Sequence, residues 1–279
     1  MLPYNPFIGL EHVDFTISGE KSAALLVHGF PGTPAEMRPL ANALNERGWT
    51  VRGLLLPGFG SDLDTLPVRR AEDWTQAVKN ALLELRVKHS PVMVIGNSMG
   101  ASLSLRVAEQ ICIDGLVILS PFWKLASAVW PLLPVLRRLV PSLKPFRIMK
   151  INYHDSRVRT ILQRFFPRMD PDDPIAQQEM RDFTLPIGMF DEIRRAGAAA
   201  YQAASQVHIP VLAVQGTKDN IASKSMTRLL LKRYAGPVSY KEVLGEHDLL
   251  DITQPVWVHV RSLVLEFAGR LEMVANPNF

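Results

Sequence analysis

The sequence feature that most constrains this chain is a serine enclosed by two glycines, GNSMG at residues 96–100. The motif directly follows an apolar run at residues 92–95 and opens a helical pattern at residues 99–110. A G-x-S-x-G sequence between a strand and a helix is typical of the sharp turn that exposes a nucleophilic serine at the edge of a parallel sheet. A Cβ atom at either glycine would collide with the neighbouring strand or helix. The alternative is an incidental match in a surface loop, so the interpretation depends on partners for Ser98 elsewhere in the chain.

Short apolar runs alternate with longer helical patterns along most of the chain. The expected strands span residues 23–27, 50–56, 92–95, 115–119, 211–215 and 238–243. One helix is expected to begin at residue 33. Four further helices are expected at residues 71–88, 99–110, 223–234 and 253–270. Strands that are apolar on both faces and separated by helices indicate a parallel sheet covered by helices on both sides. The expected fold class is therefore α/β, with a mostly parallel sheet.

The alternation of strands and helices stops between residues 121 and 208. This segment is rich in proline, arginine and helical patterns, and it contains no convincing strand. Helices are expected within it at residues 155–166 and 187–205. We therefore expect an α/β core formed by residues 1–120 and 209–279, interrupted by an inserted helical cap at residues 121–208.

The helix after the first strand has a clear start signal. Thr33 is followed by Pro34 and, three residues after the threonine, by Glu36. This spacing predicts a capping box, in which the threonine hydroxyl and the glutamate carboxylate each accept a hydrogen bond from a free backbone N–H at the helix start.

The loop before this helix, HGFPG at residues 28–32, follows a strand and precedes a capped helix. That position predicts that the backbone N–H of Phe30 lies beside the serine turn. Together with the N–H of Met99, it would form an oxyanion hole with two donors. The side chain of His28 is expected to brace the loop by hydrogen bonding, because a second catalytic base is unnecessary.

A serine hydroxyl is a poor nucleophile without a base, and the base needs an acid that orients it. His247 follows the last expected strand, and Asp219 follows the strand before it. Both therefore lie at carboxyl ends of strands, where open parallel sheets build their sites. The chain order of serine, aspartate and histidine is the one found in α/β-hydrolases. Asp248 and Asp251 are rival acids, and the remaining histidines are interpreted as surface or structural residues.

Composition excludes several classes of partner. The 279 residues carry 31 Lys and Arg against 27 Asp and Glu, a net charge of only +4. So small an excess, without a recognisable motif, does not indicate a nucleic-acid-binding protein. Asp170, Asp172 and Asp173 lack the alternating ligand spacing of a calcium loop, so no metal is expected. No cofactor is expected either.

A single cysteine, Cys112, excludes an intrachain disulfide and is compatible with a reducing compartment. The first residues lack a basic region followed by an apolar run, so no signal peptide is expected. The apolar stretch at residues 125–136 contains two prolines and is too short to span a bilayer. From these features we expect a cytoplasmic protein.

Several segments together resemble a known family. LLVHGFPGTPAEMRPLANAL, LLLPGFG, VIGNSMGASLSL, LAVQGTKD and GEHD are similar to the bacterial carboxylesterases and monoacylglycerol lipases of the α/β-hydrolase superfamily. The resemblance implies a Ser–His–Asp hydrolase that acts on carboxylic esters, with an acyl pocket under a helical cap. It also implies Phe30 and Met99 as oxyanion donors. Two departures are Ala101, where many relatives have glycine, and Glu246, where a small residue is common.

Three other functions remain open on the residues alone. The GNSMG motif also resembles that of hydrolases that split a C–C bond in products of aromatic ring cleavage. Acyltransferases use the same triad, and a ligand-binding protein on an inactive hydrolase scaffold is a further alternative. Serine at the turn, rather than aspartate, argues against haloalkane dehalogenase or epoxide hydrolase chemistry.

The beginning of the expected cap is densely apolar. Its apolar residues are Phe122, Trp123, Trp130, Leu132, Leu133, Val135 and Leu136. This position predicts a roof over the site, in which Phe122, Trp123 and Trp130, together with Phe30, bind an apolar acyl chain. The alternative is that these side chains pack the interior of the cap itself.

The expected cap is also basic between residues 137 and 168. Its cations are Arg137, Arg138, Lys144, Arg147, Lys150, Arg157, Arg159, Arg164 and Arg168. This excess is compatible with an acidic substrate or with weak contact to an anionic membrane surface. A solvated basic outer face is the simpler interpretation.

Overall fold

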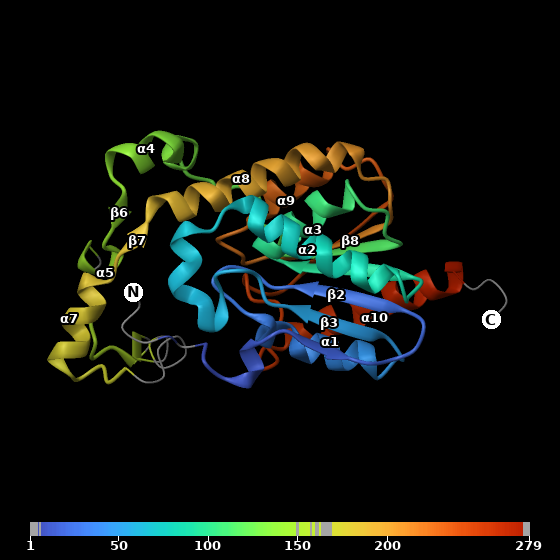
Figure 1. Cartoon of the computed structure of the whole chain (residues 1–279), viewed down its shortest axis with the longest axis horizontal. Helices are drawn as coiled ribbons and strands as arrows, with labels where there is room; N and C mark the ends of the chain where they lie inside the picture. Colours follow the sequence, from blue (N-terminus) through green and yellow to red (C-terminus); the bar gives the residue numbers. More distant parts are fainter. Residues whose placement is uncertain are drawn as a thin grey trace.

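A computed structural model describes residues 5, 7–148, 151–156, 158–159, 162 and 169–275. In these residues the chain forms a seven-stranded sheet with the order β1-β3-β2-β4-β5-β8-β9 (Figure 1). The strands are β1 (Phe15–Ile17), β2 (Ala23–Val27), β3 (Thr50–Leu54), β4 (Val92–Asn97), β5 (Gly115–Leu119), β8 (Val211–Gly216) and β9 (Val238–Val243). All neighbouring strands run parallel except β1, which pairs antiparallel with β3.

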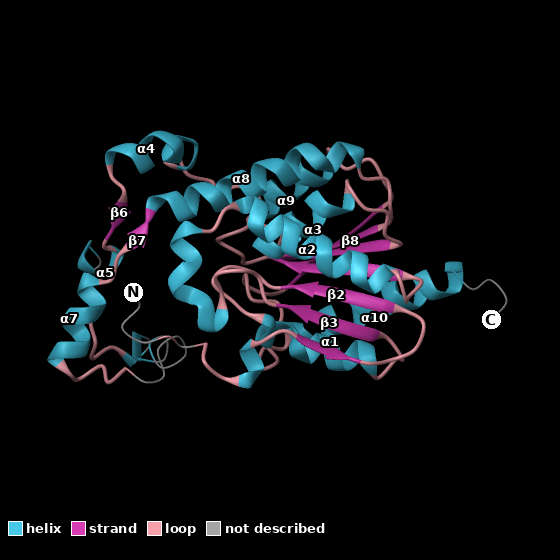
Figure 2. Cartoon of the chain, viewed as in Figure 1, coloured by secondary structure: helices cyan, strands magenta, loops and turns pink. Residues whose placement is uncertain are grey.

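Helices cover both faces of this sheet. The α-helices are α1 (Arg38–Asn45), α2 (Ala71–Arg86), α3 (Met99–Ala108), α4 (Leu133–Leu139), α5 (Pro145–Ile148), α7 (Pro174–Asp182), α8 (Ile187–Ala203), α9 (Lys224–Leu231) and α10 (Val256–Ala275). Short 3-10 helices span Leu10–His12, Pro34–Met37, Gly60–Val68, Trp130–Leu132 and Ala204–Gln206. Figure 2 shows α1 toward the bottom of the view and α8 toward the top, and the apolar contacts place α1 and α10 on one face of the sheet and α2, α3 and α8 on the other.

The alternation of side chains along β2 explains why the sheet needs two layers of helices. Ala23, Leu25 and Val27 belong to an apolar cluster shared with α2, α3 and α8. Ala24 and Leu26 belong to a second cluster shared with α1 and α10. Successive residues of a strand point to opposite faces, so a strand that is apolar at every position is buried on both.

The expected strands agree closely with the observed ones. The predictions for 23–27, 115–119 and 238–243 are confirmed at both ends. The expected helix at residue 33 begins instead with the 3-10 turn Pro34–Met37 and becomes α-helical at Arg38. The last helix extends to Ala275 rather than to residue 270. Strand β1 was not expected, because three residues at an edge give too short a pattern to recognise.

Residues 121–208 leave the main sheet between β5 and β8, and we call them the inserted segment. Figure 2 shows α4, α5, α7 and a small sheet of β6 (Ser142–Leu143) and β7 (Leu185–Pro186) beyond the arrowheads of the main strands. No strand was expected here, but each of these two has only two residues. The expected helix at 187–205 is confirmed as α8, whereas most of that expected at 155–166 lies outside the described residues.

Helix α8 ties the inserted segment to the remainder of the chain. It packs along α3 and α4, and Ile187, Met189 and Ile193 belong to the same apolar cluster as α2 and α3. Among the described residues, no helix is both long enough and apolar enough to cross a membrane.

We expect replacement of Leu26 by alanine to lower the free energy of unfolding by roughly 2–5 kcal/mol, because it leaves a cavity in a closely packed layer. Leu26 is 0% exposed, whereas Leu10 is 84% exposed. Leu10→Ala is therefore the matched control, expected to change the free energy by less than about 0.5 kcal/mol. Urea unfolding of both variants measures the difference, and equal effects would contradict this assignment of the core.

Candidate active site

Ser98 occupies the turn between β4 and α3 in a strained conformation, with φ of 53° and ψ of −115°. Positive φ is uncommon for a residue other than glycine and is often found at functional sites. A Cβ added at Gly96 would overlap the backbone of α3, and one at Gly100 would overlap the carbonyl oxygen of Val27. The expectation that only glycine fits these two positions is confirmed. The two close contacts hold the serine in its unfavourable conformation.

Three side chains distant in the sequence meet at this turn. Nε2 of His247 lies 2.9 Å from Oγ of Ser98, and Nδ1 of the same ring lies 2.8 Å from Oδ2 of Asp219. A ring that donates Nδ1–H to the carboxylate leaves Nε2 free to accept the proton of the serine hydroxyl. The structure thus brings together the three residues expected from the sequence, in a geometry suited to proton transfer.

Asp219 is held by several donors besides the imidazole. Its Oδ1 accepts hydrogen bonds from the N–H groups of Ile221 at 2.8 Å and Ala222 at 2.9 Å. Its Oδ2 accepts one from Nε2 of Gln215 at 3.0 Å. Burial acts to raise the pKa of Asp219, but the bonds from His247 and the two N–H groups outweigh it, so the pKa lies below its usual value. The carboxylate is therefore ionised at neutral pH.

Two supporting residues were missed by the sequence analysis. Gln215 is fully buried at the end of β8, where its carbonyl oxygen accepts a hydrogen bond from Oγ1 of Thr227 at 2.6 Å. Ser120 follows β5 and donates its hydroxyl to the backbone carbonyl of His247 at 3.0 Å. The polar Gln215 at the end of the apolar run VLAVQ was a visible signal, whereas nothing in the sequence connects Ser120 with His247.

The loop after β2 lies directly against the nucleophile. A Cβ at Gly29 would be 3.0 Å from Cβ of Ser98. Nδ1 of His28 donates to the carbonyl oxygen of Gly29 at 2.8 Å, and its Nε2 accepts from the N–H of Leu56 at 3.1 Å. Burial lowers the pKa of His28 to about 4, so the ring is neutral at pH 7. This agrees with the expectation that the side chain braces the loop.

The aromatic residues expected to bind substrate fall into two environments. Phe122 donates its N–H to the carbonyl oxygen of Ser98 at 3.2 Å, and its ring packs edge-on against Trp130 at 5.5 Å. The ring of Phe30, on the loop after β2, packs edge-on against Phe190 of α8 at 6.3 Å. Phe30 and Phe122 thus reach the serine turn from different elements.

Trp123 is engaged elsewhere. Its indole stacks on the ring of Tyr201 at 4.3 Å, and its N–H donates to the carbonyl oxygen of Met226 at 2.8 Å. These contacts join the start of the inserted segment to α8 and α9. In this arrangement Trp123 is buried, with 7% of its surface exposed.

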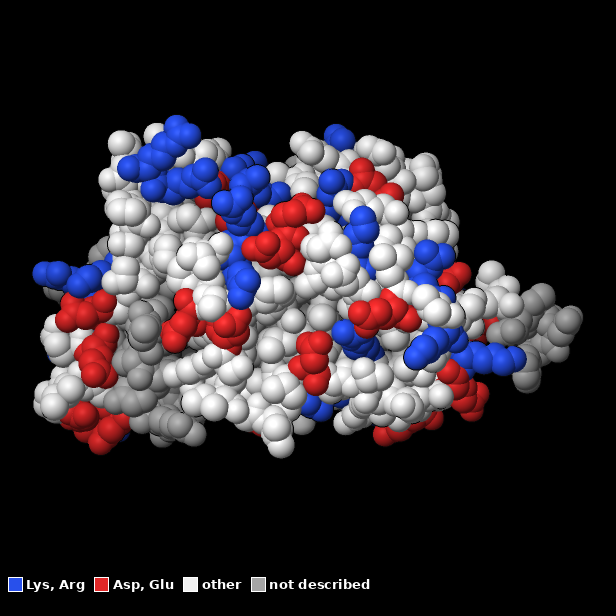
Figure 3. All heavy atoms as spheres, in the orientation of Figure 1, with Lys and Arg blue, Asp and Glu red and all other residues white. Residues whose placement is uncertain are grey.

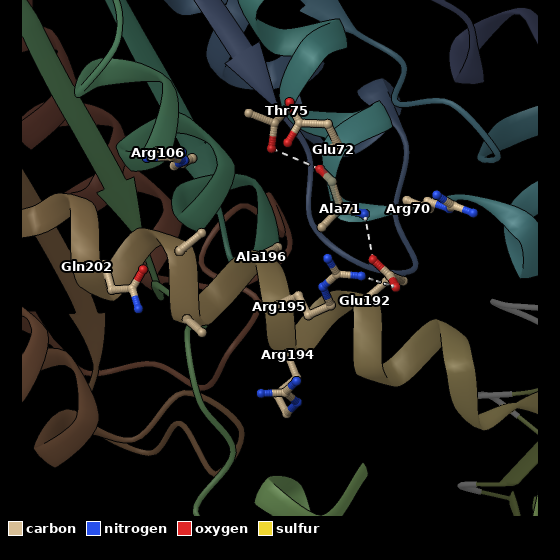
Figure 4. Close-up of a pocket in the computed structure, with 12 residues that line it drawn as sticks. Arg70, Ala71, Glu72, Thr75, Arg106, Glu192, Arg194, Arg195, Ala196 and Gln202 are labelled. Atoms are coloured by element: carbon tan, nitrogen blue, oxygen red, sulfur yellow. Dashed lines mark hydrogen bonds and ion pairs between the residues drawn. The ribbon is translucent and has the colours of Figure 1, made fainter. Parts of the chain in front are cut away.

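A hollow of about 470 Å³ between α2 and α8 is separate from this site (Figure 4). Its polar lining residues are Arg70, Glu72, Thr75, Arg106, Glu192, Arg194, Arg195 and Gln202. Three of its arginines already pair with carboxylates, Arg106 with Glu109, Arg194 with Asp191 and Arg195 with Glu192. No triad residue lines this hollow, which is too polar for an acyl chain. Within the described residues, no group of three or more His, Cys, Asp and Glu side chains could hold a metal ion.

The parallel sheet, the strained serine turn at the end of β4 and helices on both faces define an α/β-hydrolase fold. Within this fold the chain belongs to the family described as serine aminopeptidase, S33, whose sequence profile matches residues 19–246.

Individual relatives carry esterase and lipase names. The chain is 40% identical over 86 residues to a thermostable monoacylglycerol lipase of Bacillus sp. (strain H-257), a match that covers 31% of this chain and 34% of that protein. It is 34% identical over 104 residues to a carboxylesterase of Bacillus subtilis (strain 168), covering 37% and 42%. The matches thus span less than half the length of either relative.

A solved structure resembles the whole chain. The structure reported with the metagenome-derived lipolytic enzymes LipS and LipT superposes with a TM-score of 0.74 at 18% identity. The superposition covers 94% of this chain and 99% of that one. At this identity the likeness concerns the fold.

We expect the stability contributed by His28 to depend on pH. The unfolded histidine takes up a proton near pH 6.5, whereas the folded one does so only near pH 4, so the unfolded state binds more protons in between. This contribution is complete above pH 6.5 and falls by about 3 kcal/mol as the pH drops to 4.

The measurement is urea unfolding of the wild type and of His28→Gln across this pH range. The stability advantage of the wild type is expected to shrink with acidification. His259→Gln, at an exposed histidine, is the matched control. An advantage that stays constant down to pH 4 would show that His28 is not held neutral by the fold.

Proposed function

We propose that this protein is a serine hydrolase that cleaves carboxylic esters, with Ser98 as nucleophile, His247 as base and Asp219 as the orienting acid. The observation that carries the proposal is the continuous hydrogen-bond chain from the Ser98 hydroxyl through the imidazole to the carboxylate, with contacts of 2.9 and 2.8 Å. A nucleophile hydrogen-bonded to a base that is itself oriented by a third group is the arrangement that nucleophilic catalysis requires.

In the first half of the reaction, Oγ of Ser98 attacks the ester carbonyl carbon while Nε2 of His247 accepts the hydroxyl proton. The carbonyl oxygen becomes an oxyanion, which accepts hydrogen bonds from the backbone N–H groups of Phe30 and Met99. Met99 is the first residue of α3, so the positive end of the helix dipole faces the same charge. The imidazolium then protonates the leaving alcohol as the C–O bond breaks, and the acyl group stays on Ser98.

Water then hydrolyses the acyl-enzyme: water is now the nucleophile and Oγ of Ser98 is the leaving group. His247 removes a proton from water as the water oxygen attacks the acyl carbon. The bond between that carbon and Oγ of Ser98 then breaks, Oγ regains the proton from the imidazolium, and the carboxylic acid is released. In both halves a positive charge develops on the imidazole. The ionised carboxylate of Asp219, which has a lowered pKa, stabilises that charge and keeps the ring in the tautomer that the reaction uses.

The inserted segment is proposed to act as the cap of the site, and residues 1–120 and 209–279 as the core. An ester with an apolar acyl chain is proposed, because Phe30 and Phe122 lie on the two segments that flank Ser98 and Trp130 packs against Phe122. The lipase and carboxylesterase names of the relatives agree with such a substrate. Trp123 is proposed to support this wall from behind, since both its ring and its N–H are used in packing.

We expect Ser98→Ala to lower kcat/KM on p-nitrophenyl esters by at least roughly 1,000-fold, because the triad acts as a unit. A series of acyl chain lengths on the wild type measures the preference for apolar chains. Covalent labelling by a fluorophosphonate should occur in the wild type and vanish in the variant. Ser61→Ala, at an exposed serine, is the matched control.

Near-normal ester turnover by Ser98→Ala would overturn the proposal. A wild type that fails on every ester but splits a dienol diketone would identify a C–C bond hydrolase instead. Transfer of the acyl group to an added alcohol in preference to water would identify an acyltransferase. A wild type that neither reacts with the fluorophosphonate nor turns over any of these compounds would indicate a ligand-binding protein.

We also propose that α4 contacts an anionic lipid surface. Leu132, at the end of the 3-10 helix that precedes α4, and Val135 and Leu139 within α4 are 53%, 57% and 73% exposed. Arg138, also exposed, lies within the same stretch, and basic side chains gather over α4 in Figure 3. Exposed apolar side chains beside cations are the combination that binds at the boundary between headgroups and acyl chains.

Leu139→Ser is expected to lower binding to vesicles that contain phosphatidylglycerol by roughly tenfold, because one leucine no longer enters the lipid. Leu244→Ser is the matched control, since Leu244 is 74% exposed and lies outside the inserted segment. Vesicle sedimentation measures both, and high salt should weaken binding of the wild type. Equal effects of the two substitutions, or a wild type that does not bind, would exclude this surface.

A further inference from the structure

Glu36 does not make the hydrogen bond expected from the sequence. Thr33 caps the 3-10 helix by accepting from the N–H of Ala35, but the Glu36 carboxylate does not complete a capping box. Its Oε1 instead accepts from the N–H of Gly29 at 2.8 Å and from Nδ2 of Asn97 at 2.9 Å. One carboxylate oxygen therefore joins the loop after β2 to the residue that precedes Ser98.

The bond to Gly29 acts on the peptide beside the proposed oxyanion donor. The carbonyl of Gly29 and the N–H of Phe30 belong to one planar trans peptide, so they point in opposite directions. Nδ1 of His28 donates to the carbonyl oxygen of Gly29 at 2.8 Å. Oε1 of Glu36 accepts from the N–H of the same Gly29. Two fixed points on Gly29 determine the direction of the Phe30 N–H. The donor on the carbonyl also polarises the peptide and strengthens its N–H as a donor.

The bond to Asn97 holds the segment that carries Met99, the second proposed oxyanion donor. Asn97 is 7% exposed and lies next to Ser98, which precedes Met99 at the start of α3. The loop and the serine turn already touch, since a Cβ at Gly29 would be 3.0 Å from Cβ of Ser98. Glu36 thus bridges the two backbone segments that supply the Phe30 and Met99 donors.

The surroundings of the carboxyl group make this bridge unusual. Burial raises the pKa of Glu36, with Asp248 acting in the same direction, while the two hydrogen bonds and His247 act in the opposite direction. A partly buried acid is costly unless its hydrogen bonds are satisfied, and both described bonds of Glu36 go to segments outside its own helix. The position is therefore better explained by what the acid holds than by the stability of the short helix.

We propose that Glu36 is a positioning residue for the oxyanion hole, which it aligns by bridging the Gly29 N–H and the Asn97 side-chain amide. The inference rests on the proposed ester hydrolysis and concerns the same site. Glu36 itself does not contact the reacting atoms. Its effect lies in the distance and angle between the Phe30 and Met99 N–H groups, which determine how well a developing oxyanion is bound.

The test compares Glu36→Ala and Glu36→Gln on a p-nitrophenyl ester that the wild type hydrolyses. The alanine variant is expected to lose roughly ten- to hundredfold in kcat with KM within about threefold, because a displacement near 1 Å harms the transition state more than substrate binding. The glutamine variant keeps an acceptor oxygen and is expected to stay within about threefold of the wild type. Glu46→Gln, at the exposed C-cap residue of α1, is the matched control.

A trifluoromethyl ketone provides a second readout, because its hemiketal oxyanion occupies the same two donors. Its inhibition constant should rise for Glu36→Ala in proportion to the loss in kcat/KM, and should stay unchanged for Glu36→Gln. A purely structural role would lower the melting temperature without this proportionality. If the alanine variant does not fold, Glu36→Asp, which is shorter by one methylene and cannot reach both donors in the same geometry, takes its place in both measurements.

Two results would overturn the inference. One is a folded Glu36→Ala or Glu36→Asp with kcat and inhibitor affinity within threefold of the wild type. The other is a loss in Glu36→Gln as large as in Glu36→Ala, which would mean that charge rather than an acceptor is required. An inactive wild type would instead refute the proposed function, so the two failures are distinguishable.

Discussion

The structure depends on the close contact between the serine turn and the end of β2. Ser98 adopts a positive φ that is unfavourable for its side chain, and nothing in an isolated segment would hold it there. Gly100 lies so close to the carbonyl oxygens of Val27 and His28 that no side chain fits between them. Packing of α3 against the end of β2 therefore compensates for the strain, and the hydroxyl is displayed at the sheet edge as a consequence.

The parallel arrangement of the sheet accounts for the assembly of the site. Strands β4, β5, β8 and β9 all end at the same edge, and each is followed within a few residues by a polar group of the site. Ser98, Ser120, Asp219 and His247 come from these four strand ends, although Ser98 and His247 are 149 residues apart. Each carboxyl end points the same way, so the sequence order of the groups needs no relation to their distances in space.

Much of this arrangement is predictable because it follows from local patterns. The buried strands are continuous apolar runs, and a GNSMG motif between a strand and a helix is typical of one kind of turn. The core and the positions of Ser98, Asp219 and His247 could therefore be predicted from the sequence. Strand β1 and the pair β6 and β7 have no comparable pattern, since their pairing is determined by distant partners. The cytoplasmic location expected from Cys112 stays a prediction.

Glu36 and Trp123 show a different reason why sequence is insufficient. The T-x-x-E spacing at Thr33 correctly indicates a helix start, yet the carboxylate has a better partner in a loop that only the tertiary fold brings near. Trp123 lies in an apolar stretch that indicates a buried wall, but the position of its indole is determined by Tyr201 and Met226, far along the chain. Local patterns identify polar and aromatic groups, whereas their partners depend on the whole fold.

The two acids near the nucleophile illustrate how hydrogen-bond partners influence the pKa of a carboxyl group. Asp219 has donors on both oxygens, from His247, Gln215, Ile221 and Ala222, and its pKa is lowered despite burial. The described hydrogen bonds of Glu36 both go to one oxygen, and there burial dominates and its pKa is raised. The pKa of Asp219 is thus lowered and that of Glu36 raised, in agreement with the different roles proposed for them. The carboxylate of Asp219, held by four donors, faces the imidazole that becomes positive. The carboxyl group of Glu36 has fewer described donors and lies where the loop needs an acceptor atom rather than a full charge.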